Sequence, residues 1–248
     1  MPSDGCGTPS DPPATLNVAN EYIVTFPPSY DGTTPIPLIF GLHGAGRTNT
    51  DFRQTDARTQ DSDLEATYIM AYPKSSGNDW TGQLSTNIGR VEALHERLLN
   101  DYCVDTSRVF ATGHSSGAQF TTEFHCQRDG ILRAVAPVAG SEFGNNCAPI
   151  PTLLIHGEND SVRGNNGSAH VEKYRSWNAC GSMTMPYEVA TCNSAAGGAQ
   201  VNPGCVEYQD CSARLIWCSH DDPNYNGGTN HGWPCFANDA IFDFFATF

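Results

Sequence analysis

The stretch Gly113-His114-Ser115-Ser116-Gly117 decides the fold that we expect for this chain. It follows the apolar run Arg108-Val109-Phe110-Ala111-Thr112 and opens an apolar-patterned segment from Ala118 to Cys126. A strand, a G-x-S-x-G turn and a helix in this order form a nucleophile elbow, which holds the serine out at the rim of a sheet. The turn is so tight that side chains larger than glycine on either side of the serine would collide with the strand or the helix. The stretch therefore predicts an acyl-transfer enzyme with Ser115 as its nucleophile.

Short apolar runs recur along the chain, with helical segments between them. Most of the runs are continuous and β-branched, as is typical of strands buried on both faces of a sheet. They are Tyr22–Phe26, Pro37–Leu42, Thr67–Ala71, Val109–Ala111, Ala134–Val138, Pro151–Ile155 and Leu215–Cys218. From Ile88 to Leu99, apolar residues repeat at three- and four-residue spacing, which predicts an amphipathic helix on the sheet. This alternation predicts an α/β fold with a mostly parallel, doubly wound sheet and helices on both faces.

The length of 248 residues fits one large domain better than two small ones. We expect a single catalytic domain over residues 1–248, with a disulfide-stabilised, insertion-like stretch at about 180–218. Thirteen basic against 27 acidic residues give a net charge of −14, which disfavours nucleic acid and anionic membranes as partners. No run approaches the ~18 consecutive apolar residues of a membrane-spanning helix.

Ten cysteines are far more than an average cytosolic enzyme carries, and they predict five disulfides and an oxidising compartment. No pair has C-x-x-C spacing and none lies in a Cys/His cluster of metal-ligand pattern, so we expect no metal. Ten cysteines allow roughly 945 pairings, which leaves the connectivity open. The first residues show neither a basic nor an apolar signal region, so we expect a secreted, extracellular protein in its mature form.

A serine hydroxyl needs a histidine to take its proton and an acid to fix the tautomer of that histidine. Where the serine stands on such an elbow, the acid and then the histidine follow it along the chain. The run Pro151–Ile155 ends in His156-Gly157-Glu158-Asn159-Asp160, which places acids at the carboxyl end of a strand, where ligand chemistry occurs in open α/β sheets. We predict Asp160 as the acid. The alternatives are Glu158, or a role for Asp160 as a helix cap only.

The predicted base is His231, in Asn230-His231-Gly232-Trp233-Pro234. It lies in a loop between the last strand and the last helix, where this order of residues requires the base. His220, which directly follows a strand, and a purely structural role for His231 are the alternatives. His170 follows Asp160 by only ten residues and stands in a helical stretch.

The second strand ends in Leu42-His43-Gly44-Ala45-Gly46, the position that supplies one half of the oxyanion hole in hydrolases with this elbow. The predicted donors are the backbone amides of Ala45 and Ser116, because small residues let an amide approach the developing alkoxide. His43 is included among the residues near the substrate. We interpret it as an orienting residue for this loop, in preference to a proton carrier.

Two tryptophans are candidates for an aromatic-accepting substrate pocket. Trp80 follows the third strand in a polar loop, and Trp233 stands two residues after the predicted base. Stacked rings gain stability beyond plain burial, so either indole could hold an aromatic acyl group. The alternative for both is that they pack as part of the core.

With these residues identified, the chain resembles the secreted feruloyl esterases of carbohydrate esterase family 1, whose broader group includes acetylxylan esterases and polyhydroxybutyrate depolymerases. The resemblance covers nearly the whole chain. It is carried by Leu42-His43-Gly44-Ala45-Gly46, by the segment from Val104 to Gly117, by Ile155-His156-Gly157-Glu158-Asn159-Asp160 and by Asn230-His231-Gly232-Trp233-Pro234. It implies an α/β-hydrolase fold and a Ser115, Asp160, His231 triad acting on esters of the plant cell wall. The segment Cys180–Cys218 matches no motif of the family.

The leading functional hypothesis is an extracellular serine esterase that releases ferulic or related hydroxycinnamic acids from feruloylated arabinoxylan or small cinnamate esters. We expect it to act as a monomer and without a cofactor. The same triad would also serve an acetylxylan esterase or a polyhydroxybutyrate depolymerase, although polar loops disfavour binding to a solid apolar polymer. A hydrolase-fold protein that only binds is the remaining alternative, and the competent residue at every triad position argues against it.

Overall fold

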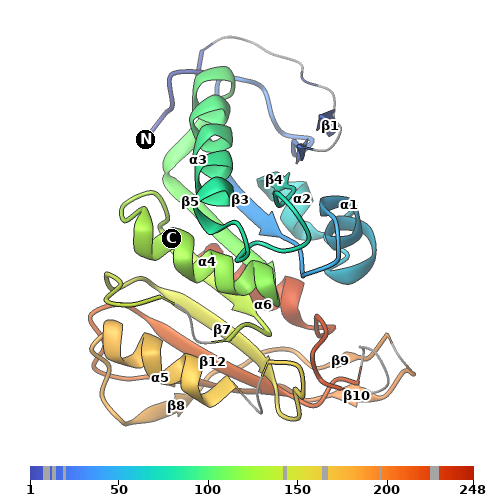
Figure 1. Cartoon of the computed structure of the whole chain (residues 1–248), viewed down its shortest axis with the longest axis vertical. Helices are drawn as coiled ribbons and strands as arrows, with labels where there is room; N and C mark the ends of the chain where they lie inside the picture. The colour runs from blue at the N-terminus through green and yellow to red at the C-terminus, as the bar shows by residue number, and fades with distance from the viewer. Residues whose placement is uncertain are drawn as a thin grey trace.

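The computed structural model describes residues 1–7, 12, 15–18, 21–141, 144–163, 167–195, 197–223 and 229–248. Within these residues a ten-stranded sheet runs through the molecule in the order β1-β2-β4-β3-β5-β6-β7-β12-β11-β8 (Figure 1). Its strands are β1 Thr15–Val18, β2 Tyr22–Thr25, β3 Ile36–Leu42, β4 Ile69–Pro73, β5 Val104–His114, β6 Ala134–Val138, β7 Thr152–Gly157, β8 Thr184–Pro186, β11 Gly204–Tyr208 and β12 Leu215–His220. A separate pair consists of β9 Cys192–Asn193 and β10 Gln200–Val201.

The six inner strands, from β4 to β12, are parallel, as the sequence predicts. The outer strands on both sides pair antiparallel. The seven apolar runs of the sequence correspond to β2 to β7 and β12, whereas β1 and β8 to β11 escaped the sequence analysis. These strands are short, and only Val201 and Cys205 in them are buried, so their residues show no continuous apolar run. β8, for example, is exposed along its whole length.

Helices cover both faces of the sheet. They are α1 Asn49–Asp51, the π-helix η1 Phe52–Asp56, α2 Asp63–Thr67, α3 Leu84–Asp101, α4 Ser116–Gln127, α5 Ser168–Trp177 and α6 Ala237–Phe245. Figure 1 shows α3, α4 and α5 on the near side of the sheet and α6 behind it. Alternate strand residues serve the two layers: Leu38 and Phe40 pack toward α3 and α4, and Ile39 packs toward α2 and α6. This period of two explains how one strand supplies two hydrophobic cores.

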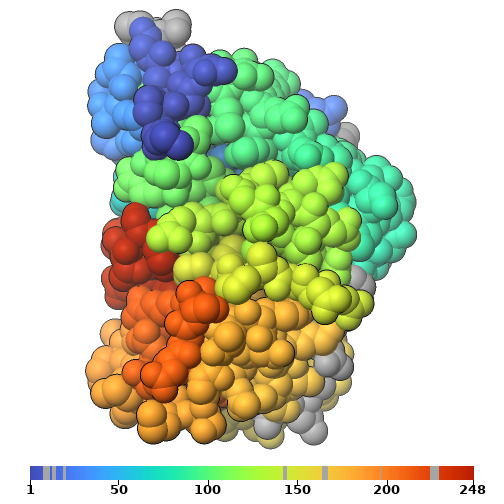
Figure 2. Space-filling model, turned by 90° about the vertical axis from the view of Figure 1, so that its left-hand side faces the viewer, coloured from blue at the N-terminus to red at the C-terminus, as the bar shows by residue number. Residues whose placement is uncertain are grey.

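Five disulfides confirm the prediction from the cysteine count. They join Cys6–Cys103, Cys126–Cys147, Cys180–Cys211, Cys192–Cys235 and Cys205–Cys218. Three of the five have at least one partner in the stretch 180–218, which lies at the end of the molecule opposite the N-terminal arm (Figure 2). Among the described residues, no helix combines the length and the apolar character that crossing a membrane requires.

Candidate active site

Ser115 lies between the end of β5 and the start of α4, with a backbone φ of 56° and ψ of −113°. A non-glycine residue with positive φ is strained, and such strain is concentrated at functional sites. The flanking glycines permit this turn because a Cβ on Gly113 would lie 2.6 Å from the backbone of Gly117, and one on Gly117 would lie 2.2 Å from the carbonyl oxygen of Leu42. Backbone atoms cannot move aside as a flexible side chain can. The elbow thus requires glycine at both positions.

The structure brings together the three side chains that the sequence predicts as a triad. Ser115 Oγ lies 3.0 Å from His231 Nε2, and His231 Nδ1 lies 2.7 Å from Asp160 Oδ2. All three residues are buried. A carboxylate can only accept, so His231 Nδ1–H donates to Asp160 and Nε2 is left to accept the proton of Ser115. This is the arrangement that a general base beside a serine nucleophile requires.

Asp160 is fully buried, and each of its carboxylate oxygens has two hydrogen-bond donors. Oδ1 accepts from the backbone amides of Val162 at 2.8 Å and Arg163 at 3.0 Å. Oδ2 accepts from His231 and from His156 Nε2, which lies 3.1 Å away. Burial by itself raises the pKa of the Asp160 carboxyl, but the hydrogen bonds from His156, His231 and the Arg163 amide lower it well below its ordinary value. Asp160 is therefore ionised at neutral pH.

The alternatives that the sequence left open lie elsewhere. Glu158 is exposed and accepts a hydrogen bond from Ser219 at 3.3 Å. His220 is buried at the end of β12, where its Nδ1 accepts from the amide of Asp222 at 3.2 Å. His170 is buried on α5, with its Nε2 3.4 Å from Thr122 Oγ1. Geometry thus favours Asp160 over Glu158 and His231 over His220.

The loop after β3 approaches the nucleophile closely. A Cβ on Gly44 would lie 3.7 Å from Ser115 Cβ and 3.1 Å from His114 Nδ1. Ala45, the next residue, is exposed on this loop. Ser116 begins α4, and the first amides of a helix have no partner within it. The two predicted oxyanion donors, the amides of Ala45 and Ser116, therefore stand on the segments that flank Ser115.

His43 supports this loop from inside the core. It is fully buried, its Nδ1–H donates to the carbonyl of Gly44 at 2.8 Å, and its Nε2 accepts from the amide of Ser75 at 3.1 Å. Burial lowers the pKa of His43 and so favours the neutral ring, which such acceptance needs. A side chain enclosed in this way cannot touch a substrate. The prediction of His43 as a substrate-binding residue is wrong, and its geometry matches the orienting role.

Trp80 is also part of the core. Its exposed fraction is 0%, its ring lies 4.7 Å from that of Phe120, and its Nε1 donates to the His43 carbonyl at 2.8 Å. A fully buried indole cannot line a substrate pocket, so the prediction of Trp80 as a substrate-binding residue is wrong. The cause is a contact with α4, some forty residues further along the chain, that no local pattern reveals.

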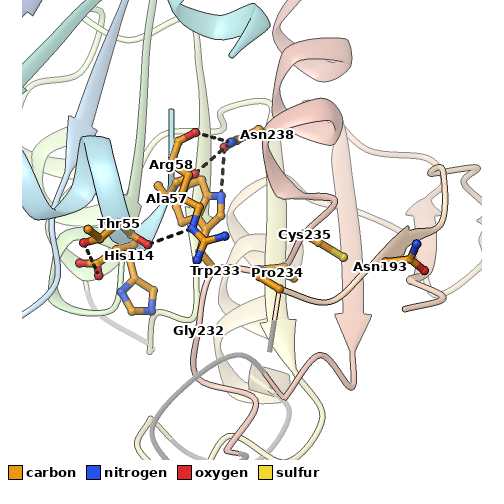
Figure 3. Close-up of a pocket in the computed structure, with 12 residues that line it drawn as sticks. Thr55, Ala57, Arg58, His114, Asn193, Gly232, Trp233, Pro234, Cys235 and Asn238 are labelled. Carbon is orange, nitrogen blue, oxygen red and sulfur yellow. Dashed lines mark hydrogen bonds between the residues drawn. The ribbon is translucent and has the colours of Figure 1, made fainter. Parts of the chain in front are cut away.

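Trp233 differs from Trp80 because it borders a cavity whose wall also contains His114 and Gly232, the neighbours of Ser115 and His231 (Figure 3). Its ring packs edge-on against Phe52 with centroids 5.2 Å apart, and its Nε1 donates to Asn238 Oδ1 at 3.0 Å. Only 7% of its surface is exposed. Trp233 remains a candidate for contact with a substrate, through the small part of its surface that is exposed.

Three residues of the site escaped the sequence analysis. His156 lies near the end of β7, four residues before Asp160, and no sequence motif marks it as a partner of that carboxylate. Arg163 places its Nε 3.4 Å from Ser115 Oγ, so a guanidinium lies beside the nucleophile. His114 Nε2–H donates to the backbone carbonyl of His231 at 2.6 Å, and burial lowers the pKa of His114 to about 4. His114, the first x of G-x-S-x-G, thus holds the loop that contains His231.

A solved structure shows the same fold. An acetyl xylan esterase from Aspergillus awamori superposes with a TM-score of 0.64 at 16% identity, over 91% of this chain and 93% of that one. With its parallel sheet and its elbow, the chain has the α/β-hydrolase fold. It is a carboxylic ester hydrolase, because its sequence relatives over 98% of its length are esterases.

Those relatives also define the family. The chain is 30% identical to a probable feruloyl esterase C of Aspergillus terreus and 28% identical to feruloyl esterase C of Emericella nidulans. Each match covers 98% of this chain and 90% of the relative. No family model matches the chain. The chain belongs to the feruloyl esterases of carbohydrate esterase family 1, the family that its motifs resemble.

Proposed function

We propose that this protein is an extracellular serine esterase that releases ferulic acid or a related hydroxycinnamic acid from plant cell-wall polysaccharide. The observation that carries the proposal is the continuous chain of contacts from Ser115 Oγ through His231 to Asp160, with distances of 3.0 and 2.7 Å. The feruloyl esterase names of the near full-length relatives support the choice of acyl group. Five disulfides favour an oxidising, extracellular location.

In the proposed acylation step, Ser115 Oγ attacks the ester carbonyl carbon while His231 Nε2 takes the hydroxyl proton. Negative charge develops on the carbonyl oxygen, where the amides of Ala45 and Ser116 would donate hydrogen bonds. The tetrahedral intermediate then collapses: the bond between the carbonyl carbon and the sugar oxygen breaks, and His231 returns the proton to that oxygen. The alcohol leaves and Ser115 carries the acyl group.

Deacylation repeats these steps with water as the nucleophile. His231 takes a proton from water, the resulting hydroxide adds to the acyl carbon, and the proton passes to Ser115 Oγ as the acid departs. Asp160 stays ionised throughout and stabilises the imidazolium form of His231, since the pKa of Asp160 is held low by its donors. Each cycle consumes one water and one ester and yields one acid and one alcohol.

The test compares methyl ferulate, acetylated xylan and hydroxybutyrate oligomers as substrates of the wild type and of Ser115→Ala. We expect methyl ferulate to give the highest kcat/KM, and Ser115→Ala to lower kcat by more than about a thousandfold. Preference for acetylated xylan or for the oligomers would replace feruloyl release by one of the alternative ester specificities. Comparable turnover by the wild type and Ser115→Ala would remove Ser115 as the nucleophile.

A further inference from the structure

A cavity of about 430 Å³ borders the residues next to Ser115 and His231. Figure 3 shows the residues that line it. Three segments of the chain surround it: the end of η1 and the turn after it, the loop that follows His231 together with the start of α6, and the β9 region of the insertion-like stretch. His114, next to the nucleophile, and Gly232, next to the base, are both in its wall. The remaining wall residues are Thr55, Asp56, Ala57, Arg58, Asn193, Ala195, Trp233, Pro234, Cys235 and Asn238. The cavity adjoins the triad through these two sequence neighbours of Ser115 and His231.

The wall has the chemistry that recognises a hydroxyl-rich, uncharged ring. The exposed residues Thr55, Arg58 and Asn193 contribute a hydroxyl, a guanidinium and an amide, while Asp56 is paired with Arg47. Such groups form hydrogen bonds in both directions with sugar hydroxyls. A cinnamate ring would instead require apolar or aromatic surface. Trp233 offers little surface, because only 7% of it is exposed.

The cavity wall is also held rigid, which lowers the cost of ordering it when a ligand binds. Cys192 is bonded to Cys235, so the insertion-like stretch is tied to the loop after the predicted base. The buried carboxylate of Asp222 reinforces the tie: it accepts from Ser194 Oγ at 2.5 Å and from the amide of Cys235 at 3.0 Å. The stretch 180–218 thus contributes a fixed wall to the cavity.

The opposite wall is fixed as well. Arg58 has a backbone φ of 51°, a left-handed conformation that is strained for arginine. Asn238 holds the turn through a hydrogen bond from Nδ2 to the carbonyl of Ala57 at 2.9 Å. Asp56 forms an ion pair with Arg47 of the loop that contains Ala45.

We propose that this cavity is the subsite for the sugar that carries the ester, and that Arg58 and Asn193 are its specificity-determining side chains. The proposal rests on the esterase function proposed above. It assigns the insertion-like stretch, which matches no family motif, to recognition of the alcohol part of the substrate.

The test measures one ratio in each protein: kcat/KM for an arabinose ester of ferulic acid divided by kcat/KM for methyl ferulate, which has no sugar. Arg58→Asn shortens the side chain and tolerates the left-handed backbone, and Asn193→Ala removes the amide. We expect each variant to lower the ratio about fivefold to tenfold, the effect of one lost hydrogen bond. The matched control is Arg97→Asn, an arginine on α3 outside the cavity, which should leave the ratio unchanged.

A ratio that is unchanged or raised in both variants would contradict the assignment of the cavity to the sugar. The cavity would then hold the acyl group, or no part of the substrate. This result differs from failure of the proposed function, in which the wild type hydrolyses neither ester. Removal of the Cys192–Cys235 disulfide by serine substitution at both positions is a second test of the same proposal. We expect it to lower the ratio as well, whereas serine at Cys180 and Cys211, which form a disulfide outside the cavity, should not.

Discussion

At the scale of single residues, the carboxylate of Asp160 is shared between two histidines, and His156 is a positioning residue for the acid. Loss of its donor in His156→Phe should lower kcat about tenfold with little change in KM, the effect of one hydrogen bond to a charged group. With fewer donors on Asp160, the Asp160–His231 pair holds a proton more tightly. The acid limb of the kcat/KM profile should therefore move to higher pH. The measurement is the full pH profile.

His156→Gln, which keeps an N–H donor, is the matched variant and should recover part of kcat. An unaltered acid limb in His156→Phe, accompanied only by lower stability, would show that the residue has a packing role alone.

The sequence was sufficient to select Ser115, Asp160 and His231, the three side chains that the structure joins, because their signals are local: a glycine-flanked turn, a strand end and chain order. It could not separate Trp80 from Trp233, since both stand in polar loops near predicted strand or helix ends. Which of them is accessible depends on distant parts of the chain: Phe120 packs on Trp80, whereas Trp233 lies in the wall of a cavity.

At the scale of elements, the nucleophile elbow depends on the absence of a Cβ at Gly113 and at Gly117, and Gly117 has the closer contact. Gly117→Ala places that atom 2.2 Å from a backbone carbonyl, so we expect a loss of about 3 kcal/mol or more in the free energy of unfolding. Gly89→Ala is the control in another helix: nothing lies within 4 Å of its Cβ, and the change should stabilise by about 0.5–1 kcal/mol. Urea unfolding of both variants measures the difference. Equal effects would contradict this view of the elbow.

The inner strands and α3 could be predicted because each has a continuous or periodic apolar signal. The short strands β8 to β11 could not, since they are held by pairing and by disulfides and not by burial of a regular face. The position of the stretch 180–218 beside the active site was equally out of reach. It follows from the pairing of Cys192 with Cys235, which is one of many possible pairings.

At the scale of the whole molecule, buried neutral histidines should make stability depend on pH. Burial lowers the pKa of His114 to about 4 and those of His170 and His220 to about 3. In the unfolded chain these rings take up protons near the ordinary value of about 6.5, so below that pH the unfolded state binds more protons. Stability therefore falls as pH falls, by up to about 1.4 kcal/mol per pH unit for each histidine.

Urea unfolding at a series of pH values between 7 and 5 measures this slope. His170→Gln, which removes one of the three histidines from a position outside the triad, should reduce the slope by about one proton. A free energy of unfolding that does not change over this range would contradict the assignment of these histidines as neutral in the folded state.

The most direct test of the whole account is covalent labelling with an organophosphonate serine probe, followed by mass spectrometry of the modified peptides. We predict one equivalent of adduct on Ser115, loss of ester hydrolysis in proportion to labelling, and no adduct in Ser115→Ala. An adduct on another residue, or full hydrolysis by protein that is completely labelled at Ser115, would contradict the claim that Ser115 is the nucleophile.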